Sequence, residues 1–356
     1  MSIRFSRLLL GVGMAIAVQA IFPTVMQANQ QLDAIIEQGN ELIQNQNFSQ
    51  AIQSYQEAVR LDGENPRIYS ALGYAHAQLG NFEEAAIAYQ RAVLLDNENP
   101  KFYSALGFSL ANKGDYLNAA NAYQRAVQLK PDNVEYHLGL ASVLFRSENF
   151  AAALNAYEQV LALDDDNADA LRNRIASMLQ IGRNQEAAAL LDETFFKLPT
   201  DGQIRIHAAI TWLGLNDRPR ALRLLEEARK LEPRNFQVQL KVAKVYVNQG
   251  LLPEAIAAFQ RATEIEPNSS DALSNLGATA LQDKDYITSI IAYRQLSELY
   301  PNDPGVYENL GLAFQGRNRT SEAIEALTTA KNLYKRQGNQ QGMKKIDALL
   351  EAIADS

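Results

Sequence analysis

One pattern of thirty-four residues recurs through most of this chain and limits what it can fold into. The clearest copy spans residues 100–133, where apolar side chains at three- and four-residue spacing form two runs. Such spacing places them on one face of an α-helix. Residues 112–115 break the first run with a turn, and Pro131 ends the second. Each copy is therefore predicted to be a helix hairpin, which cannot bury its apolar face alone and must stack on its neighbours.

Three positions keep this register over nine periods without an insertion. The first is small in all but one repeat: Gly39, Gly73, Gly107, Ala141, Ile175, Ala209, Ala243, Gly277 and Gly311. The second is also small: Ala51, Ala85, Ala119, Ala153, Ala187, Ala221, Ala255, Ser289 and Ala323. The third is large: Tyr55, Tyr89, Tyr123, Tyr157, Leu191, Leu225, Phe259, Tyr293 and Leu327. We expect the small residues where the two helices of a hairpin cross, and the large one to fill the space toward the next hairpin.

This spacing resembles the tetratricopeptide repeat (TPR), whose pattern is W-x2-L-G-x2-Y, then A-x3-F, then P. The residues that carry the resemblance in the clearest copy are Tyr103, Leu106, Gly107, Leu110, Ala119, Tyr123 and Pro131, with Tyr in the Trp position. It covers about residues 32–337. It implies an all-α fold, a right-handed superhelical solenoid of nine TPR helix hairpins. The shared role of this family is to hold other proteins.

Residues 1–28 lie outside the repeats and have the layout of a secretory signal peptide. Arg4 and Arg7 make a basic start, residues 8–22 are apolar, and a short polar stretch ends at Ala28. Cleavage is expected after Ala28 or Ala20, which predicts an exported protein in a periplasm or facing a lumen. The alternative is a membrane anchor formed by residues 8–22, although this run is shorter than the roughly 18 residues expected of a spanning helix.

Two further stretches depart from the repeat. Residues 338–356 have one more amphipathic pattern, which predicts a C-terminal capping helix over the last hairpin. In the fifth repeat Ile175 replaces the small residue at the helix crossing, and Arg174 replaces the preceding Leu. A kink or altered superhelix around residues 170–215 and ordinary drift within the array both remain open.

Composition excludes several classes of function. The chain has no Cys, so a disulfide framework, a thiol nucleophile and a thiolate metal site are impossible. Its formal charge of −8 disfavours binding to nucleic acid. No nucleophile–base arrangement or phosphate-binding loop is found, and the repeats leave no residues for a catalytic domain. We therefore expect a protein that is not an enzyme.

The family resemblance places first-helix residues on an inner, concave face. Read in this way, the early repeats present the predicted partner-binding residues Arg67, Tyr74, Lys101, Phe108, Phe145 and Arg146. The rings could hold apolar side chains of an extended peptide, and the cations its carboxylates. The alternative is that Tyr74 and Phe108 only pack against neighbouring repeats.

Family members that grip the C-terminal carboxylate of chaperones resemble one another in a Lys, two Asn and a further Lys and Arg. Asn40 stands in one of these places, but Ile36 and Ala71 replace the Lys and the next Asn. Docking to cytosolic chaperones is therefore not expected.

The densest acidic run consists of Asp164, Asp165, Asp166 and Asp169, which could form a loose site for calcium or manganese. Capping of the following helix is the alternative, because Asp is favoured at helix starts. The histidines His76, His137 and His207 lack ligand spacing, and we expect core or surface roles for them.

The predicted function is a protein–protein interaction scaffold without a cofactor, which helps a membrane protein complex to assemble or mature on the extracytoplasmic side. The layout and the tail over residues 333–340 resemble cyanobacterial exported TPR proteins that assist photosystem assembly or chlorophyll enzymes. Among these, the processing-associated kind carries manganese to photosystem II. This resemblance implies the alternative function, a manganese-binding and -delivering assembly factor.

Overall fold

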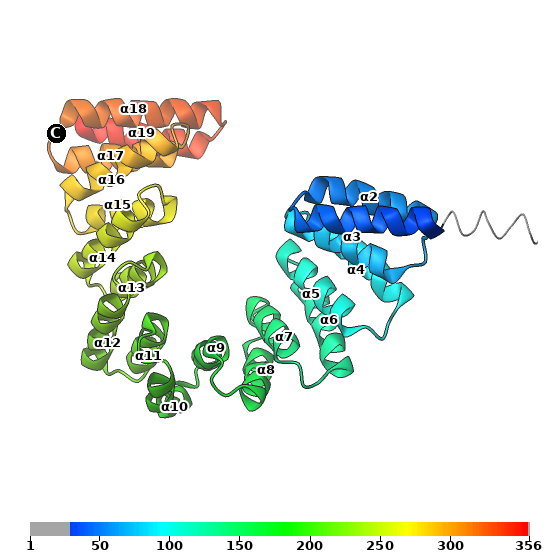
Figure 1. Cartoon of the computed structure of the whole chain (residues 1–356). Helices are drawn as coiled ribbons and strands as arrows, with labels where there is room; N and C mark the ends of the chain where they lie inside the picture. Colours follow the sequence, from blue (N-terminus) through cyan, green and yellow to red (C-terminus); the bar gives the residue numbers. More distant parts are fainter. Residues whose placement is uncertain (1–28, 355–356) are drawn as a thin grey trace, which may run out of the picture. The chain divides into compact units, whose positions relative to one another are not determined.

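The computed structural model describes residues 29–354, and all regular secondary structure in this range is α-helical (Figure 1). The chain is helical over residues 29–44. The helices that follow, up to residue 180, are α2 (Phe48–Leu61), α3 (Pro66–Gln78), α4 (Phe82–Leu95), α5 (Pro100–Lys113), α6 (Tyr116–Leu129), α7 (Val134–Arg146), α8 (Phe150–Leu163) and α9 (Ala168–Gln180). Those after it are α10 (Asn184–Lys197), α11 (Gly202–Gly214), α12 (Arg218–Leu231), α13 (Phe236–Asn248), α14 (Leu252–Ile265), α15 (Ser270–Gln282), α16 (Tyr286–Leu299), α17 (Pro304–Gly316), α18 (Thr320–Arg336) and α19 (Gln340–Ala354). The predicted all-α array of helix hairpins is confirmed.

Helix starts keep the predicted period. From α3 onward, each first helix of a hairpin begins 34 residues after the one before it, from Pro66 to Pro304. The second helices keep the same step from Phe48 to Thr320. Each residue before a first helix accepts a backbone N–H with its side chain, which satisfies an otherwise free donor of the first turn. These caps are Asn65, Asn99, Asn133, Asn167, Asp201, Asn235, Ser269 and Asp303.

In the five hairpins with glycine at the first position, this glycine lies against the large residue of the second helix. A Cβ atom added at Gly107 in α5 would lie 2.7 Å from the ring of Tyr123 in α6, and one at Gly277 would lie equally close to Tyr293. The same Tyr123 ring also contacts Gly139 of the next hairpin. One aromatic ring therefore joins both helices of its own hairpin and the first helix of the next.

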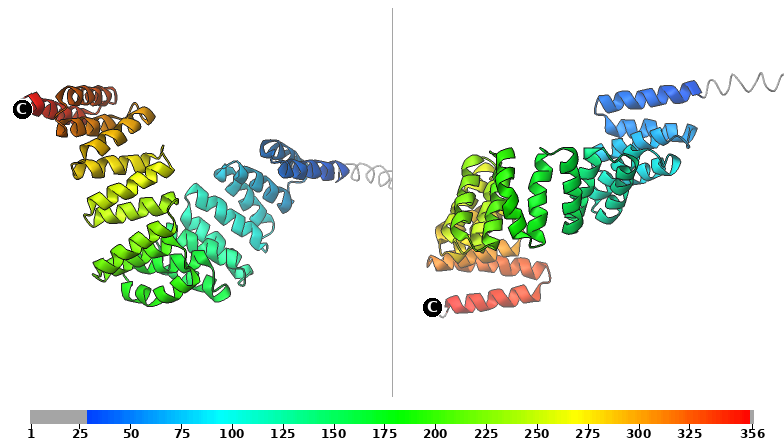
Figure 2. Two further views of the ribbon diagram at one scale, coloured as in Figure 1. Left: turned by 60° about the vertical axis from the view of Figure 1, so that its left-hand side comes forward. Right: turned by 90° about the horizontal axis from the view of Figure 1, so that it is seen from below.

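Contacts divide the chain into two compact units, with the boundary after Ile181. The first unit contains the helices up to α9, and the second those from α10 onward. Within each unit, successive helices lie side by side, as the further views also show (Figure 2). The boundary falls within residues 170–215, where the repeat pattern is weakest.

The second unit ends in α19, close to the helix predicted over residues 338–356. Ile346 and Ile353 are buried against the ninth hairpin. Beneath them, the nearly buried carboxylate of Glu308 in α17 accepts a hydrogen bond of 2.9 Å from the Tyr334 hydroxyl and pairs with Lys345 of α19. Both apolar and ionic contacts thus hold the last helix.

The predicted signal peptide (1–28), with the alternative anchor (8–22), lies outside the described residues. From residue 29 onward, no helix combines the length and hydrophobicity that crossing a membrane requires.

The turn inside each hairpin contains one residue with positive φ, and these also recur every 34 residues. They are Gln46, Gly80, Gly114, Glu148, Gly182, Asn216, Gly250, Lys284 and Asn318. A left-handed conformation costs a residue other than glycine roughly 1–2 kcal/mol. The non-glycine members of this series therefore carry backbone strain.

We expect Lys284→Gly, at φ 64°, to raise the free energy of unfolding by about 1 kcal/mol, because glycine adopts this conformation without strain. The reverse change, Gly114→Ala, should lower it by a similar amount. No atom lies within 4 Å of the added Cβ at Gly114, so its effect reports the backbone alone. Urea unfolding measures both changes, and no difference between the two variants would contradict the strain.

Candidate functional site

Two adjoining hollows lie on the first helices of the early repeats in the first unit. The first hollow, about 420 Å³, is lined by Asn40, Ile43, Tyr55, Arg67, Ser70, Ala71, Tyr74, Tyr89, Lys101, Phe102 and Ala105. The second hollow, about 560 Å³, is lined by Tyr74, Ala77, Gln78, Tyr89, Lys101, Ser104, Ala105, Phe108, Tyr123, Lys130, Asn133, Glu135 and Tyr136. Four residues line both hollows: Tyr74, Tyr89, Lys101 and Ala105. The hollows therefore form one groove along α3 and α5, which we call the inner groove.

The predicted rings Tyr74 and Phe108 stand in the walls of the inner groove. Tyr74 is 44% exposed and Phe108 is 49% exposed. Phe108 also makes an edge contact with Phe82 of α4, at 6.2 Å between ring centres. Each ring therefore packs in part against its own surroundings, as the alternative expected, and keeps about half of its surface open.

The predicted cations Arg67 and Lys101 are exposed at the first turns of α3 and α5. Among the side chains from residue 29 to 354, no ion pair engages either of them. Their charges are therefore available to an anionic group in the groove, next to the positive ends of two helix dipoles.

Phe145 and Arg146, also predicted for this face, line neither hollow. The guanidinium of Arg146 lies 4.7 Å from the ring centre of Tyr116 and donates a hydrogen bond of 3.0 Å to its hydroxyl. Phe145 is half-buried, with its ring edge-on to Phe150 at 5.2 Å. Contacts within the unit thus occupy both side chains.

The floor of the inner groove contains tyrosines that the sequence analysis assigned to packing alone. Tyr89 and Tyr123 are 5% and 7% exposed, yet both line the hollows, and no described group forms a hydrogen bond to either hydroxyl. Burial raises the pKa of Tyr123 to about 12, and burial also raises the pKa of Tyr89, with a smaller effect of Tyr74. The signal was visible in the sequence, because this position is Tyr in the first four repeats and Leu or Phe in the next three.

Tyr55, at the same position in the first repeat, is different because its hydroxyl donates a hydrogen bond of 2.8 Å to Oδ1 of Asn40. This bond also occupies Asn40, the single residue that matched the chaperone-binding pattern.

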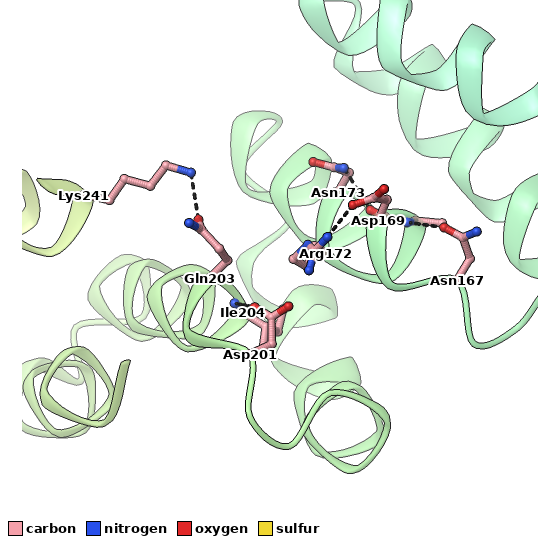
Figure 3. A network of polar contacts seen from close by, with 9 residues as sticks. Asn167, Asp169, Arg172, Asn173, Asp201, Gln203, Ile204 and Lys241 are labelled. Atoms are coloured by element: carbon pink, nitrogen blue, oxygen red, sulfur yellow. Dashed lines mark hydrogen bonds and ion pairs between the residues drawn. The ribbon is translucent and has the colours of Figure 1, made fainter. Parts of the chain in front are cut away.

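Two lysines on a first helix of the second unit are engaged by side chains of neighbouring first helices. Lys244 of α13 forms an ion pair of 2.8 Å with Asp271 of α15. Lys241 donates a hydrogen bond of 2.7 Å to the side chain of Gln203 in α11 (Figure 3). These bridges join the first helices of neighbouring repeats, whereas Arg67 and Lys101 have no such partner among the described side chains.

The acidic run Asp164, Asp165, Asp166 and Asp169 does not assemble a metal site. No group of three or more potential ligands is arranged to hold a metal ion between residues 29 and 354. Asp164 accepts a hydrogen bond of 3.0 Å from Asn167. Asp169 pairs with Arg172 one turn along α9 (Figure 3). Asn167, rather than an aspartate, caps this helix. Contacts at the start of α9 therefore engage Asp164 and Asp169, and the described residues of this run offer no ligand arrangement for calcium or manganese.

The histidines occupy separate places in the fold. His137 is nearly buried, and its Nε2 lies 2.8 Å from the carbonyl oxygen of Pro131. His76 is half-buried in α3, and its Nδ1 has no hydrogen-bond partner among the described residues. Burial lowers the pKa of His76, and Glu84 opposes this shift.

The Tyr55→Phe and Tyr123→Phe variants form a matched test of the groove floor. Tyr55→Phe should lower the free energy of unfolding by about 1 kcal/mol, because it removes the bond to Asn40. Tyr123→Phe should leave stability nearly unchanged, since its hydroxyl has no described partner. Equal losses in urea unfolding would show that the Tyr123 hydroxyl is bonded within the protein.

The lowered pKa of His76 predicts that the protein loses folding stability in acid. Because its pKa is lower in the folded state than the value of about 6.5 in the unfolded chain, the unfolded chain binds the proton more readily. The stability from neutral His76 is thus present above the unfolded pKa and is lost as the pH falls toward the folded pKa. His76→Leu, which copies the residue at Leu110, should lose less stability between about pH 7.5 and about pH 5 than the wild type. Parallel urea titrations at both pH values measure this, and identical losses would exclude a role for His76.

Comparison with known proteins agrees with this architecture. Tetratricopeptide repeat profiles match residues 36–100, 144–213, 208–270 and 243–304, and a TPR repeat profile matches residues 109–147. Proteins of this family generally act as scaffolds for protein–protein interaction and are typically not enzymes.

Similarity to individual proteins is more limited. A TPR repeat-containing protein of Picosynechococcus sp. (strain PCC 7002) is 55% identical over 80 residues, which is 22% of this chain and 21% of that relative. The chain thus spans only about a fifth of that relative's length. A solved TPR protein from Parabacteroides merdae aligns with a TM-score of 0.57 at 17% identity, over 70% of this chain and 99% of its own. YrrB, described as a TPR protein with an unusual peptide-binding site, aligns with a TM-score of 0.45 at 20% identity, over 52% and 95%.

The repeat profiles together span nearly all of residues 36–304, and the structure has the helix period and the small-to-large crossing contact. This chain belongs to the tetratricopeptide repeat family.

Proposed function

We propose that the inner groove of the first unit holds an extended segment of a partner protein. The observation that carries this proposal is the pairing of exposed rings with unengaged cations in one hollowed surface. Tyr74 and Phe108 offer apolar area, and Arg67 and Lys101 stand beside them without an ion-pair partner among the described residues. A peptide can bury apolar side chains against such rings while its carboxylates approach the cations.

The contrast between the two units supports this choice of surface. In the second unit, Lys244 and Lys241 are already engaged by Asp271 and Gln203. A ligand there would have to break these contacts before it formed its own. In the inner groove of the first unit, a ligand has no such contacts to break. Its cations therefore favour an anionic ligand more strongly than the lysines of the second unit do.

We further propose that this scaffold helps a membrane protein complex to assemble or mature on the extracytoplasmic side. The signal-like layout of residues 1–28 supports export. The identity to a Picosynechococcus protein supports a cyanobacterial setting, in which photosystem biogenesis is the process we favour.

The test is affinity capture from envelope and membrane fractions with the wild type and the Tyr74→Ala/Phe108→Ala variant. A specific membrane-complex subunit should be captured by the wild type and reduced at least about tenfold by the variant, because removal of hot-spot rings costs more than about 1 kcal/mol each. Circular dichroism and urea unfolding first establish that both proteins are folded.

Ile87→Ala/Leu117→Ala is the matched control. These apolar side chains are 60% and 74% exposed in the same unit but line neither hollow. The control should capture as the wild type does. Equal capture by all three proteins would move binding away from the inner groove.

A further inference from the structure

Six side chains that line the first hollow recur, 34 positions later, in the lining of the second. The cation, the serine, the small residue, the ring and the floor tyrosines all recur 34 positions later. The pairs are Arg67 and Lys101, Ser70 and Ser104, Ala71 and Ala105, Tyr74 and Phe108, Tyr55 and Tyr89, and Tyr89 and Tyr123. The hollows therefore share these six positions, although the second also has Glu135 and Lys130 in its lining.

Within the first unit, this set ends on both sides. At the position of the cation, the first repeat has Asp33 and the fourth has Glu135, both exposed. At the position of the ring, the same repeats have Asn40 and Ser142. Glu135 itself lines the far side of the second hollow. Two cationic, ring-bearing repeats are thus flanked by acidic ones that lack the ring.

The floor also presents polar groups to the hollows. The rings of Tyr89 and Tyr123 are more than nine-tenths buried, and their hydroxyls line the hollows without a hydrogen bond from any described group. A tyrosine hydroxyl that reaches a hollow can both donate and accept a hydrogen bond. The backbone of an extended peptide along the groove offers one donor and one acceptor per residue.

We infer that the two hollows read a repeated motif: an extended peptide with two acidic side chains, each accompanied by an apolar one. This inference rests on the proposed function, since it specifies the segment that the inner groove holds. Each carboxylate pairs with Arg67 or Lys101, and each apolar side chain covers Tyr74 or Phe108. The hydroxyls of Tyr89 and Tyr123 bond the peptide backbone between them.

The spacing of the motif follows from helix packing. Helices α3 and α5, which present the two sets, contact each other. Packed helices lie about 8–10 Å apart, and an extended chain advances about 3.3 Å per residue. The two acidic–apolar pairs are therefore expected about three residues apart.

The flanking acids set the length of the motif. A third acidic residue in register would approach Asp33 at one end or Glu135 at the other, and like charges in such positions repel. Lys101 has a special place because it lines both hollows, so it should matter more than Arg67.

The test is fluorescence anisotropy with the full-length protein and labelled synthetic peptides. The peptides carry one or two Glu–Phe pairs, with spacers that place equivalent residues two to five positions apart. Matched peptides replace each Glu by Gln. The two-pair peptide at about three-residue spacing should bind at least tenfold more tightly than the one-pair peptide, because its second contact is intramolecular. Gln–Phe pairs should bind more weakly than Glu–Phe pairs.

Single substitutions test which cations bind the carboxylates of the peptide. Arg67→Gln should weaken the two-pair peptide about two- to fivefold, the range of an exposed ion pair, and Lys101→Gln should weaken it more. Arg60→Gln, which removes an exposed cation outside both hollows, should leave affinity unchanged. Glu135→Lys should create a preference for a third acidic residue, a gain that a damaged fold could not produce.

Two results overturn the inference. Equal affinity for one-pair and two-pair peptides would contradict the repeated motif. Equal affinity for Glu and Gln peptides would contradict the role of the carboxylates. If capture of the membrane partner is still lost in Tyr74→Ala/Phe108→Ala, the inner groove remains the binding surface with another kind of ligand. If that capture is also unchanged, the proposed function fails together with the inference.

Discussion

The contact between a large ring and a small residue at each helix crossing is the constraint on which this architecture depends. Tyr123 lies against Gly107 within its hairpin and against Gly139 of the next, and at both places even one added carbon would collide with the ring. Because interiors are close-packed, this contact fixes how near the helices approach. Because the pattern recurs every 34 residues, successive hairpins stack on one another in the same way. The same constraint also positions the groove floor, since the rings that hold the hairpins together end in the hollows.

The fold could be predicted closely from the sequence because its determinants are local. Helix starts, caps and turns repeat at fixed positions, and each depends on residues within one or two helical turns. The boundary after Ile181 was foreseen only as a weak stretch of the pattern. In the fifth hairpin Ile175 and Leu191 are both buried, so a large side chain takes the place of the small one. How these two side chains pack depends on residues far apart in the chain, which a repeat pattern does not encode.

The candidate site could be predicted in part, for a related reason. Counting positions along one helix selected Arg67, Tyr74, Lys101 and Phe108, which line the hollows. It also selected Phe145 and Arg146, because the count is blind to the previous hairpin, where Tyr116 engages the guanidinium. The sequence analysis assigned Tyr89 and Tyr123 to packing alone, although each side chain also lines the inner groove. The ring of Tyr89 satisfies the packing rule, whereas its hydroxyl emerges at the surface.

The contacts of the Glu308 carboxylate couple the unfolding of the ninth hairpin to that of α19. Lys345 and Tyr334 engage this group from α19 and α18, so the final helix neutralises a charge that lies inside the ninth hairpin. Detachment of α19 would separate Lys345 from Glu308 and would expose the buried side chains of Ile346 and Ile353 to water, which costs both an ion pair and apolar burial. Local fraying from the C-terminal end, common in linear arrays, is therefore suppressed at this point. The ninth hairpin and α19 should open and close as one cooperative segment, and proteases should find no separately unfolded tail there.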